Sequence, residues 1–254
     1  MGDLAAGKVA LVTGAGGGMG RSGAEIFARE GAKHVYVADL KEDGGHETVA
    51  NIERVGGAAT FVKVDVTEED EVAALIQRIV AEQGRLDAAW NNAGINDTSR
   101  AFHEFDKASW DRMIAVNLTS VFLCMKHELI QMLAQGGGAI VNTSSGAGII
   151  AAPGLPHYTA AKHGVLGITK SAAGEYNNSN IRVNAVCPGM IDTPMIQGWF
   201  ETNPELATMV LQTMPGKKLG RPAQVAEAAV WLCSDAADYV SGLSMLVDGG
   251  GVNR

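Results

Sequence analysis

A tyrosine and a lysine stand four residues apart in the segment Tyr158-Thr-Ala-Ala-Lys162. In a helix this spacing places both side chains on one face, a single turn apart. An ammonium group beside a phenol favours the phenolate and lowers the pKa of the phenol, which can then act as a general acid or base. Because the same spacing also occurs on ordinary exposed helices, this interpretation depends on a cofactor site and a partner hydroxyl elsewhere in the chain.

A glycine-rich turn near the N-terminus could supply the cofactor site. An apolar segment at 9–13 leads into Gly14-Ala-Gly-Gly-Gly18-Met19-Gly20. Glycines let the backbone approach a pyrophosphate, and a helix that begins at the turn offers free N–H groups and the positive end of its dipole. The order of strand, turn and helix predicts a dinucleotide-binding turn rather than a flexible surface loop.

Alternating strands and helices would position both motifs. Short apolar segments alternate with helical periodicity, as at 68–83, where Val72, Leu75, Ile76 and Ile79 recur at helical spacing. This order predicts the α/β class: a single Rossmann-type, doubly wound domain over residues 1–254, with a seven-stranded parallel sheet and helices on both faces. The expected strands are 9–12, 35–38, 60–64, 86–90, 140–143, 182–186 and 243–247, and the expected helices are 18–30, 68–83, 109–133, 158–176 and 222–233.

Composition and charge exclude several classes of function. The net charge of -8 and the pI near 5.2 argue against a nucleic-acid partner. The six histidines form no metal-binding motif, so we expect no metal, and no apolar run looks long enough to span a membrane. Three widely separated cysteines in apolar surroundings, Cys124, Cys187 and Cys233, predict reduced thiols and a cytoplasmic protein.

The order of the motifs resembles the classical branch of the short-chain dehydrogenase/reductase family over nearly the whole chain. The resemblance implies that the protein is an oxidoreductase with a nicotinamide cofactor, and that it forms a homotetramer. The matching motifs are Thr13-Gly14-x-x-x-Gly18-x-Gly20, Asp65-Val66, Asn91-Asn92-Ala93-Gly94, Asn117, Ser145, Tyr158-x-x-x-Lys162 and Pro188-Gly189-Met-Ile-Asp-Thr193.

An acid at the end of the second expected strand predicts NAD as the cofactor. Asp39 would accept hydrogen bonds from the adenine ribose hydroxyls and repel a 2′-phosphate. NADP-preferring relatives usually carry a basic residue directly after this position, whereas here the next residue is Leu40. The nearby cations are Lys41, two residues beyond Asp39, and Arg21, which follows the last glycine of the turn.

The resemblance assigns further residues to the cofactor site. Asp65 would bind the adenine edge beside Val66, and the Asn92-Ala93-Gly94 turn would pass close to the dinucleotide. The segment from Pro188 to Thr193 would hold the nicotinamide carboxamide. The expected cofactor-binding residues are therefore Gly14, Gly18, Met19, Gly20, Asp39, Leu40, Asp65, Val66, Asn92, Ala93, Gly94, Tyr158, Lys162, Pro188, Gly189, Ile191 and Thr193.

The resemblance also assigns the catalytic roles. Tyr158 would be the general acid/base, and Lys162 would lower its pKa and bind the nicotinamide ribose. Ser145 would hydrogen-bond the substrate oxygen, and Asn117 would position a water that links Lys162 to solvent. Ser145 lies at the family's usual offset, thirteen residues before Tyr158, so we expect its neighbour Ser144 to pack locally.

His157 precedes Tyr158 in the sequence and could be considered as an alternative base. We do not expect it to act with Tyr158, because adjacent side chains on a helix do not face each other.

Two segments are expected to contact the substrate, one at 146–156 and an irregular loop at about 191–220. Neither the first segment nor residues 191–215 contain Arg or Lys, which favours an uncharged, largely apolar and perhaps cyclic secondary alcohol or ketone. Asn96 and Ser145 could supply polar substrate contacts. The apolar side chains of the loop are Met195, Ile196, Trp199, Phe200, Met209, Leu211 and Met214, with Trp199 as the main candidate.

Two other functions remain open. A 3-oxoacyl-carrier-protein reductase would normally use NADPH and a basic surface, against which Asp39 and the net charge of -8 argue. A catalytically idle nucleotide sensor or scaffold would not need the intact set of Asn117, Ser145, Tyr158 and Lys162.

Overall fold

A seven-stranded parallel sheet forms the centre of the protein in this computed structural model, which describes residues 3–202, 207–208, 212 and 214–252. The strand order is β3-β2-β1-β4-β5-β6-β7, so the chain runs from the middle to one edge and then from the middle to the other. The direction reverses between β1 and β4, where open α/β sheets bind their ligands at the carboxyl ends of the strands. The strands are β1 (Val9–Thr13), β2 (His34–Asp39), β3 (Ala59–Lys63), β4 (Ala88–Asn91), β5 (Gly138–Thr143), β6 (Ile181–Pro188) and β7 (Ser244–Val247).

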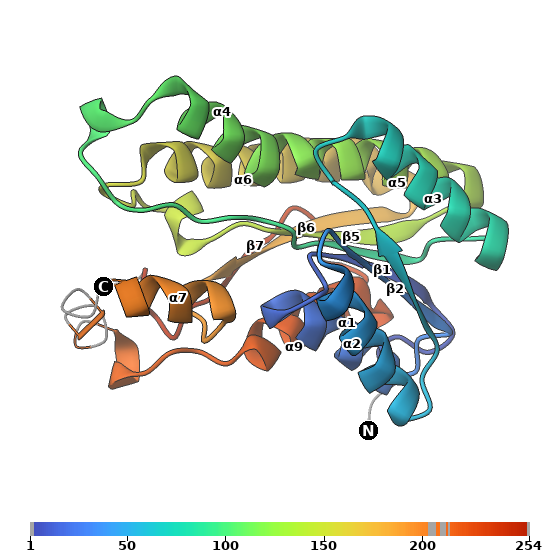
Figure 1. The fold of residues 1–254 in the computed structure, drawn as a ribbon. Coiled ribbons are helices and arrows are strands. Elements are labelled where there is room, and N and C mark those ends of the chain that lie inside the picture. The colour runs from blue at the N-terminus through green and yellow to red at the C-terminus, as the bar shows by residue number, and fades with distance from the viewer. Residues whose placement is uncertain (1–2, 203–206, 209–211, 213, 253–254) are drawn as a thin grey trace.

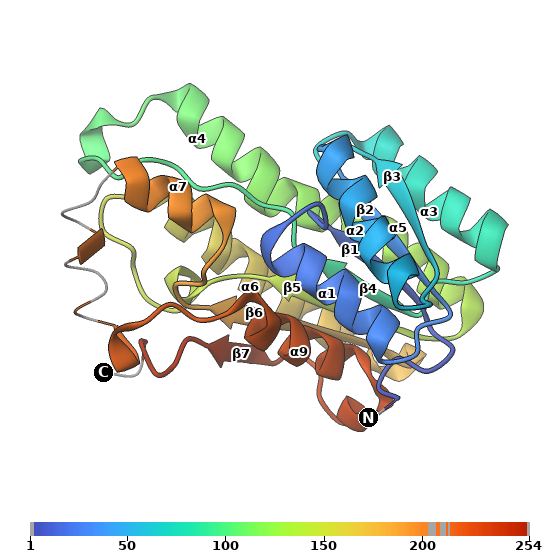
Figure 2. The ribbon, with the colours of Figure 1, turned by 60° about the horizontal axis from the view of Figure 1, so that its bottom comes forward.

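Helices cover both faces of the sheet (Figure 1). One layer holds α3 (Glu69–Gln83), α4 (Lys107–Ile114), α5 (Ser120–Gln135) and α6 (Pro156–Tyr176), and the other holds α1 (Gly18–Arg29), α2 (Glu42–Arg54) and α9 (Pro222–Cys233). A further helix, α7 (Pro194–Thr202), follows β6 and lies beyond the carboxyl ends of the strands (Figure 2). The layered Rossmann-type fold predicted from the sequence is therefore confirmed.

Three features differ from the predicted elements. Helix α2 was not predicted, because it contains two glycines and buries few side chains, with Ile52 as its main apolar contact. The expected helix at 109–133 extends over Lys107–Gln135 and contains a π-helical turn at Ala115–Thr119. The loop expected at 191–220 is in part helical, since it contains α7.

The helix Lys107–Gln135 is long and apolar enough to span a membrane by length and composition, with a mean hydropathy of 1.3 over its most apolar window. The expectation that no run is long enough was therefore wrong. Half of that window is buried inside the protein, and the helix packs against α3 and α6. This is the behaviour of a core helix, so the length of the helix is weak evidence for a membrane span.

A polar network lies in the core between the sheet and this layer of helices. Glu128 of α5 is 0% exposed, and its Oε2 accepts a hydrogen bond from Asn91 Nδ2 at 2.9 Å. The same amide of Asn91 donates to Asn142 Oδ1 at 3.1 Å, and Asn142 Nδ2 donates to the Thr169 hydroxyl at 2.9 Å. The network thus connects α5, β4, β5 and α6. Burial raises the pKa of Glu128 to about 7 despite the hydrogen bond from Asn91.

We predict that Glu128 makes the protein less stable as the pH rises. The carboxyl group has a pKa of 4.5 when exposed and about 7 in the fold, so the unfolded chain loses this proton first. The free energy of unfolding should therefore fall between these two values and remain lower above them. Glu128→Gln should reduce the loss between pH 5 and pH 8 by roughly 2 to 3 kcal/mol, measured by urea denaturation. Exposed Glu53→Gln is the control, and an equal loss in wild type and Glu128→Gln would contradict the prediction.

Candidate active site

The glycine-rich turn connects β1 to α1 and lies against the loop that follows β4. Gly14 and Gly18 have φ angles of 64° and 53°, in the left-handed region that favours glycine. A Cβ on Gly14 would lie 2.8 Å from the Cα of Ala93, so the close approach of the two loops requires glycine at this position. The N-cap of α1 is Gly17, which provides no side-chain cap. The turn therefore presents backbone without side chains at a helix N-terminus, which fits a pyrophosphate.

Asn92 holds the two loops together. Its backbone N–H donates to the Thr13 hydroxyl at 3.0 Å, and its Nδ2 donates to the Thr13 carbonyl at 3.2 Å. The backbone N–H of Ala93 donates to the same hydroxyl at 3.1 Å. The Asn92-Ala93-Gly94 segment therefore has a structural role, and it also lies where a dinucleotide on the turn would pass.

Asp39 lies at the end of β2, directly beside the turn. Its Oδ2 accepts a hydrogen bond from the Gly16 amide at 2.8 Å, and its Oδ1 accepts from the Lys41 amide at 2.9 Å. A Cβ on Gly16 would lie 2.9 Å from the Asp39 carboxylate, so no larger residue fits there without movement. Leu40 is 54% exposed. A carboxylate in this place fits an adenine ribose bound across the turn.

The other predicted cofactor residues follow β3 and β6, at the same edge of the sheet. Asp65 follows β3, and its Oδ1 accepts from the amide and hydroxyl of Thr67 at 2.9 and 2.7 Å, while Val66 is buried. The segment after β6 approaches the turn from the other side, since a Cβ on Gly18 would lie 3.2 Å from Thr193 Cγ2. Ile191 forms a parallel bridge with Gly220, which fixes this segment.

Ser145, Tyr158 and Lys162 come together between β5 and α6. Ser145 follows β5 and its hydroxyl accepts from the Ala147 amide at 3.1 Å, which begins a short 3₁₀ helix at Gly146–Gly148. Tyr158 lies in the first turn of α6 and is hydrogen-bonded to Ser145. Lys162 lies one turn later, with its Nζ 5.6 Å from the centre of the Tyr158 ring. The structure thus brings the three predicted groups into one site.

Burial controls the ionisation of this pair. It raises the pKa of Tyr158, while the hydrogen bond with Ser145 acts in the opposite direction with a smaller effect. It lowers the pKa of Lys162 to about 8. The pKa of Tyr158 in the chain alone is therefore raised rather than lowered as expected from the sequence, because desolvation of the phenol dominates.

Asn117 lies in the π-helical turn and is 1% exposed. Its side chain exchanges two hydrogen bonds with the backbone of Ile95, donating to the carbonyl at 3.1 Å and accepting from the amide at 3.3 Å. A Cβ on Gly94 would lie 2.7 Å from Asn117 Oδ1 and 3.8 Å from Lys162 Nζ. Asn117 therefore holds the loop after β4 beside Lys162.

Two neighbouring residues have other partners. The Ser144 hydroxyl is buried and donates to the Lys162 carbonyl at 2.8 Å, which confirms that Ser144 packs locally. His157 is 0% exposed, with its Nε2 3.0 Å from Asp97 Oδ2 and its ring 4.4 Å from the ring of Phe105. His157 thus connects α6 to the loop after β4, as a structural contact.

The predicted substrate contacts lie in the loop after β4 and in the segment that begins with α7. Asn96 follows the Asn92–Gly94 turn, and its Oδ1 is buried without a hydrogen-bond partner. Trp199 stacks on Phe200 in α7 with ring centres 5.5 Å apart, and Met195 at the start of α7 is 48% exposed. Of the predicted loop residues, Met209 and Leu211 lie outside the described residues.

The C-terminal segment contributes contacts that were not predicted. Asp248 follows β7 and accepts hydrogen bonds from the amides of Gly250 and Val252 at 2.8 and 2.7 Å. A Cβ on Gly146 would lie 3.0 Å from Val252 Cγ2, and one on Gly189 would lie 2.9 Å from Asp248 Cβ. The segment therefore packs behind both the Ser145 turn and the segment after β6. The only sequence signal for these contacts is the Asp-Gly-Gly-Gly run at 248–251.

Comparison with known proteins agrees with this geometry. The family model described as enoyl-(acyl carrier protein) reductase matches residues 14–251. A cis-4-hydroxycyclohexanecarboxylate dehydrogenase from Sinomonas cyclohexanicum is 44% identical over 98% of this chain and 98% of the relative. The chain belongs to the short-chain dehydrogenase/reductase family. A cyclohexanol dehydrogenase from Acinetobacter sp. strain SE19 is 41% identical over 95% of this chain and 94% of the relative.

This short-chain dehydrogenase is therefore an enzyme, an oxidoreductase that acts on CH–OH groups. A crystal structure from Beutenbergia cavernae has a TM-score of 0.92 and 32% identity over 100% of both chains. That protein is proposed to be an NAD(P)-dependent gluconate 5-dehydrogenase and contains NADP at low occupancy. The family binds nicotinamide dinucleotides.

We predict that Val252 supports the Ser145 turn. Deletion of residues 252–254 removes this contact, whereas deletion of residues 253–254 keeps it. The longer deletion should lower kcat roughly tenfold through misplacement of the Ser145 hydroxyl, while the shorter deletion should leave kcat near the wild-type value. Steady-state kinetics measure both, and mass photometry checks that assembly is unchanged. Equal activity of the two deletions would contradict the prediction.

Proposed function

We propose that the protein catalyses NAD-dependent interconversion of an uncharged, largely apolar secondary alcohol, typically cyclic, and its ketone. The observation that carries this proposal is the meeting of Ser145, Tyr158 and Lys162 after β5, at the same edge of the parallel sheet as Asp39 and the glycine-rich turn. The bound dinucleotide would accept or supply the hydride. The chain's own residues would bind the substrate oxygen and transfer its proton.

The proton transfer can be described for the alcohol oxidation. Ser145 donates a hydrogen bond to the substrate oxygen and stabilises the developing negative charge. The Tyr158 phenolate removes the hydroxyl proton, and Lys162 stabilises that phenolate from one helical turn away. Because burial raises the pKa of Tyr158, the phenolate needs positive charge in the closed site. An oxidised nicotinamide ring beside the phenol would add to the charge of Lys162.

The proposal of NAD depends on the charge around Asp39. The carboxylate faces the turn and would accept hydrogen bonds from the adenine ribose hydroxyls. A 2′-phosphate would instead place its negative charge beside that of Asp39. Asp65, Val66 and the Asn92–Gly94 segment would line the adenosine side, and Pro188, Gly189, Ile191 and Thr193 the nicotinamide side. The short distance between Gly18 and Thr193 supports one continuous site.

The proposed substrate class follows from the side chains of the two segments that are expected to contact the substrate. The segment 146–156 and α7 contain no Arg or Lys, and Ile149, Ile150 and Met195 are exposed there. Arg100, in the loop after β4, is paired with Asp97 at 3.2 Å and lies over the Phe105 ring. The unpartnered Oδ1 of Asn96 could accept a hydrogen bond from a substrate hydroxyl. We therefore favour an uncharged ring over the carboxylate-bearing ring named for the relative from Sinomonas cyclohexanicum.

We further propose a homotetramer in a reducing, cytoplasmic compartment. Phe122, Ile130 and Leu133 of α5 are 52%, 58% and 45% exposed, so this helix offers an apolar face to a second copy. The three cysteines are free and buried, as expected where disulfides do not form. The two rival functions, a carrier-protein reductase and an idle sensor, predict NADPH preference and absence of turnover, respectively.

We predict that Tyr158→Phe abolishes turnover and leaves the NAD dissociation constant within about threefold. The substitution removes only the hydroxyl that transfers the proton, so kcat should fall by at least about 10³-fold. NAD reduction with cyclohexanol, cyclopentanol, linear secondary alcohols and cis-4-hydroxycyclohexanecarboxylate measures the wild-type activity. Near-wild-type activity of the variant would refute the role of Tyr158, and wild-type inactivity with tight NAD binding would favour the sensor.

A second prediction concerns the choice of cofactor. Wild type should prefer NAD by about a hundredfold in kcat/KM, and Asp39→Ala should reduce that preference to less than about tenfold. The measurement compares initial rates with NAD and NADP at equal substrate concentration. Leu40→Ala is a neighbouring control that keeps the carboxylate. An unchanged cofactor ratio in Asp39→Ala would show that the carboxylate does not decide the preference.

A further inference from the structure

Arg21 and Asp39 bind opposite ends of Gly16. The Gly16 amide donates to Asp39 Oδ2, and the Gly16 carbonyl accepts from Arg21 Nη2, each at 2.8 Å. Only the backbone of Gly16 therefore separates the guanidinium from the carboxylate that would bind the adenine ribose. A phosphate added to the ribose hydroxyl near Asp39 would lie within reach of this cation, and arginine binds phosphate well.

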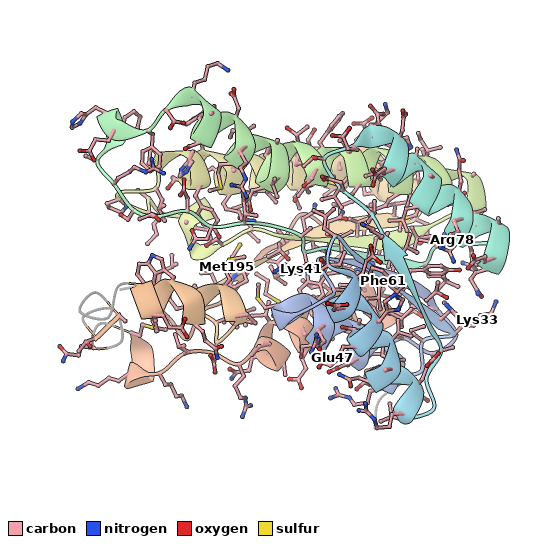
Figure 3. The ribbon with its side chains drawn as sticks, viewed as in Figure 1. Lys33, Lys41, Glu47, Phe61, Arg78 and Met195 are labelled. Atoms are coloured by element: carbon pink, nitrogen blue, oxygen red, sulfur yellow. The ribbon has the colours of Figure 1, made fainter. Side chains whose placement is uncertain are left out.

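Helix α2 binds the same guanidinium from the other side. Glu47 of α2 accepts a hydrogen bond from Arg21 Nη2 at 2.7 Å, and it projects from the helix that lies beside α1 (Figure 3). Arg21 Nε donates to the buried hydroxyl of Thr48 at 3.1 Å, and that hydroxyl donates to the Ala15 carbonyl at 2.8 Å. Arg21 is therefore attached to the turn and to α2 at once.

The close packing of α2 makes this arrangement possible. A side chain at Gly44 would collide with the Gly16 carbonyl, so the first turn of α2 lies directly on the glycine-rich turn. The side chain of Arg21 is 24% exposed, whereas that of Glu47 is 60% exposed. The carboxylate of Glu47 thus reaches the guanidinium from the solvent side, where a 2′-phosphate would approach.

We propose that Glu47 is a second determinant of cofactor choice, because it neutralises Arg21 and prevents the guanidinium from binding a 2′-phosphate. This inference rests on the proposed preference for NAD. Asp39 repels the phosphate directly, and Glu47 removes the cation that would offset that repulsion. Arg21 is therefore a potential phosphate-binding residue whose charge is neutralised by Glu47 of α2.

Lys41 is the other cation near this position. It is exposed at the N-cap of α2. Its backbone amide donates a hydrogen bond to Asp39 Oδ1 at 2.9 Å. Any gain in NADP use that comes from Lys41 would not depend on Arg21, so the two sources can be separated by substitution.

A four-variant cycle tests the proposal. It compares wild type, Glu47→Gln, Arg21→Met and the double variant, with kcat/KM for NAD and NADP and with NADP dissociation constants from calorimetry. Glu47→Gln should improve NADP binding and kcat/KM roughly fivefold and change the NAD values less than about twofold. The gain should disappear when Arg21 is Met, and it should shrink at high salt. Exposed Glu53→Gln, on the same helix, should change neither cofactor.

Three outcomes would overturn the inference. One is no gain with NADP in Glu47→Gln, another is an equal gain with and without Arg21, and the third is an equal gain in Glu53→Gln. A wild type that prefers NADP would refute the proposed NAD dependence, and that result comes from the wild-type ratio alone. Calorimetry keeps the test independent of turnover, and thermal unfolding shows whether each variant is folded.

Discussion

The active site depends on the burial of one ammonium group. Lys162 is 3% exposed, and its Nζ donates to the Thr143 carbonyl at the end of β5 at 2.9 Å. A buried charge is costly unless a polar partner is present, so the carbonyl fixes both the lysine and the helix that carries it. Since α6 also carries Tyr158, this contact helps to fix where the phenol lies relative to Ser145, two residues after the end of β5.

Two amide side chains hold the loop after β4 in place beside the lysine. Asn117 bonds the backbone of Ile95, and Asn92 bonds the backbone of Thr13, so the loop after β4 is held from two sides. The π-helical turn at Ala115–Thr119 brings Asn117 to this loop, as such turns often do at functional sites. Each interaction is local, yet together they join β1, β4 and the long helix at the carboxyl ends of the strands.

Sequence patterns predicted those parts of the molecule that depend on a single segment. The strands, the glycine-rich turn and the Tyr158–Lys162 spacing follow from local periodicity and from backbone requirements. Contacts between distant segments had no such signal. In the sequence, Arg21 had no recognisable partner, because Glu47 lies on α2, which was not predicted. That helix contains two glycines and buries few side chains. Val252 had no sequence signal, because its contact with Gly146 exists only once β7 has paired with β6.

The direction of the Tyr158 pKa shows why spacing alone cannot give the chemistry. The four-residue interval placed the lysine correctly, but it contained no information about solvent. In the folded chain, desolvation raises the pKa of the phenol and lowers that of Lys162 to about 8. Both shifts oppose the charged forms that proton abstraction needs. In such a site, added positive charge acts at low dielectric and has a large effect. In the proposed mechanism, proton transfer by Tyr158 would therefore depend on the charge of the group that binds beside it.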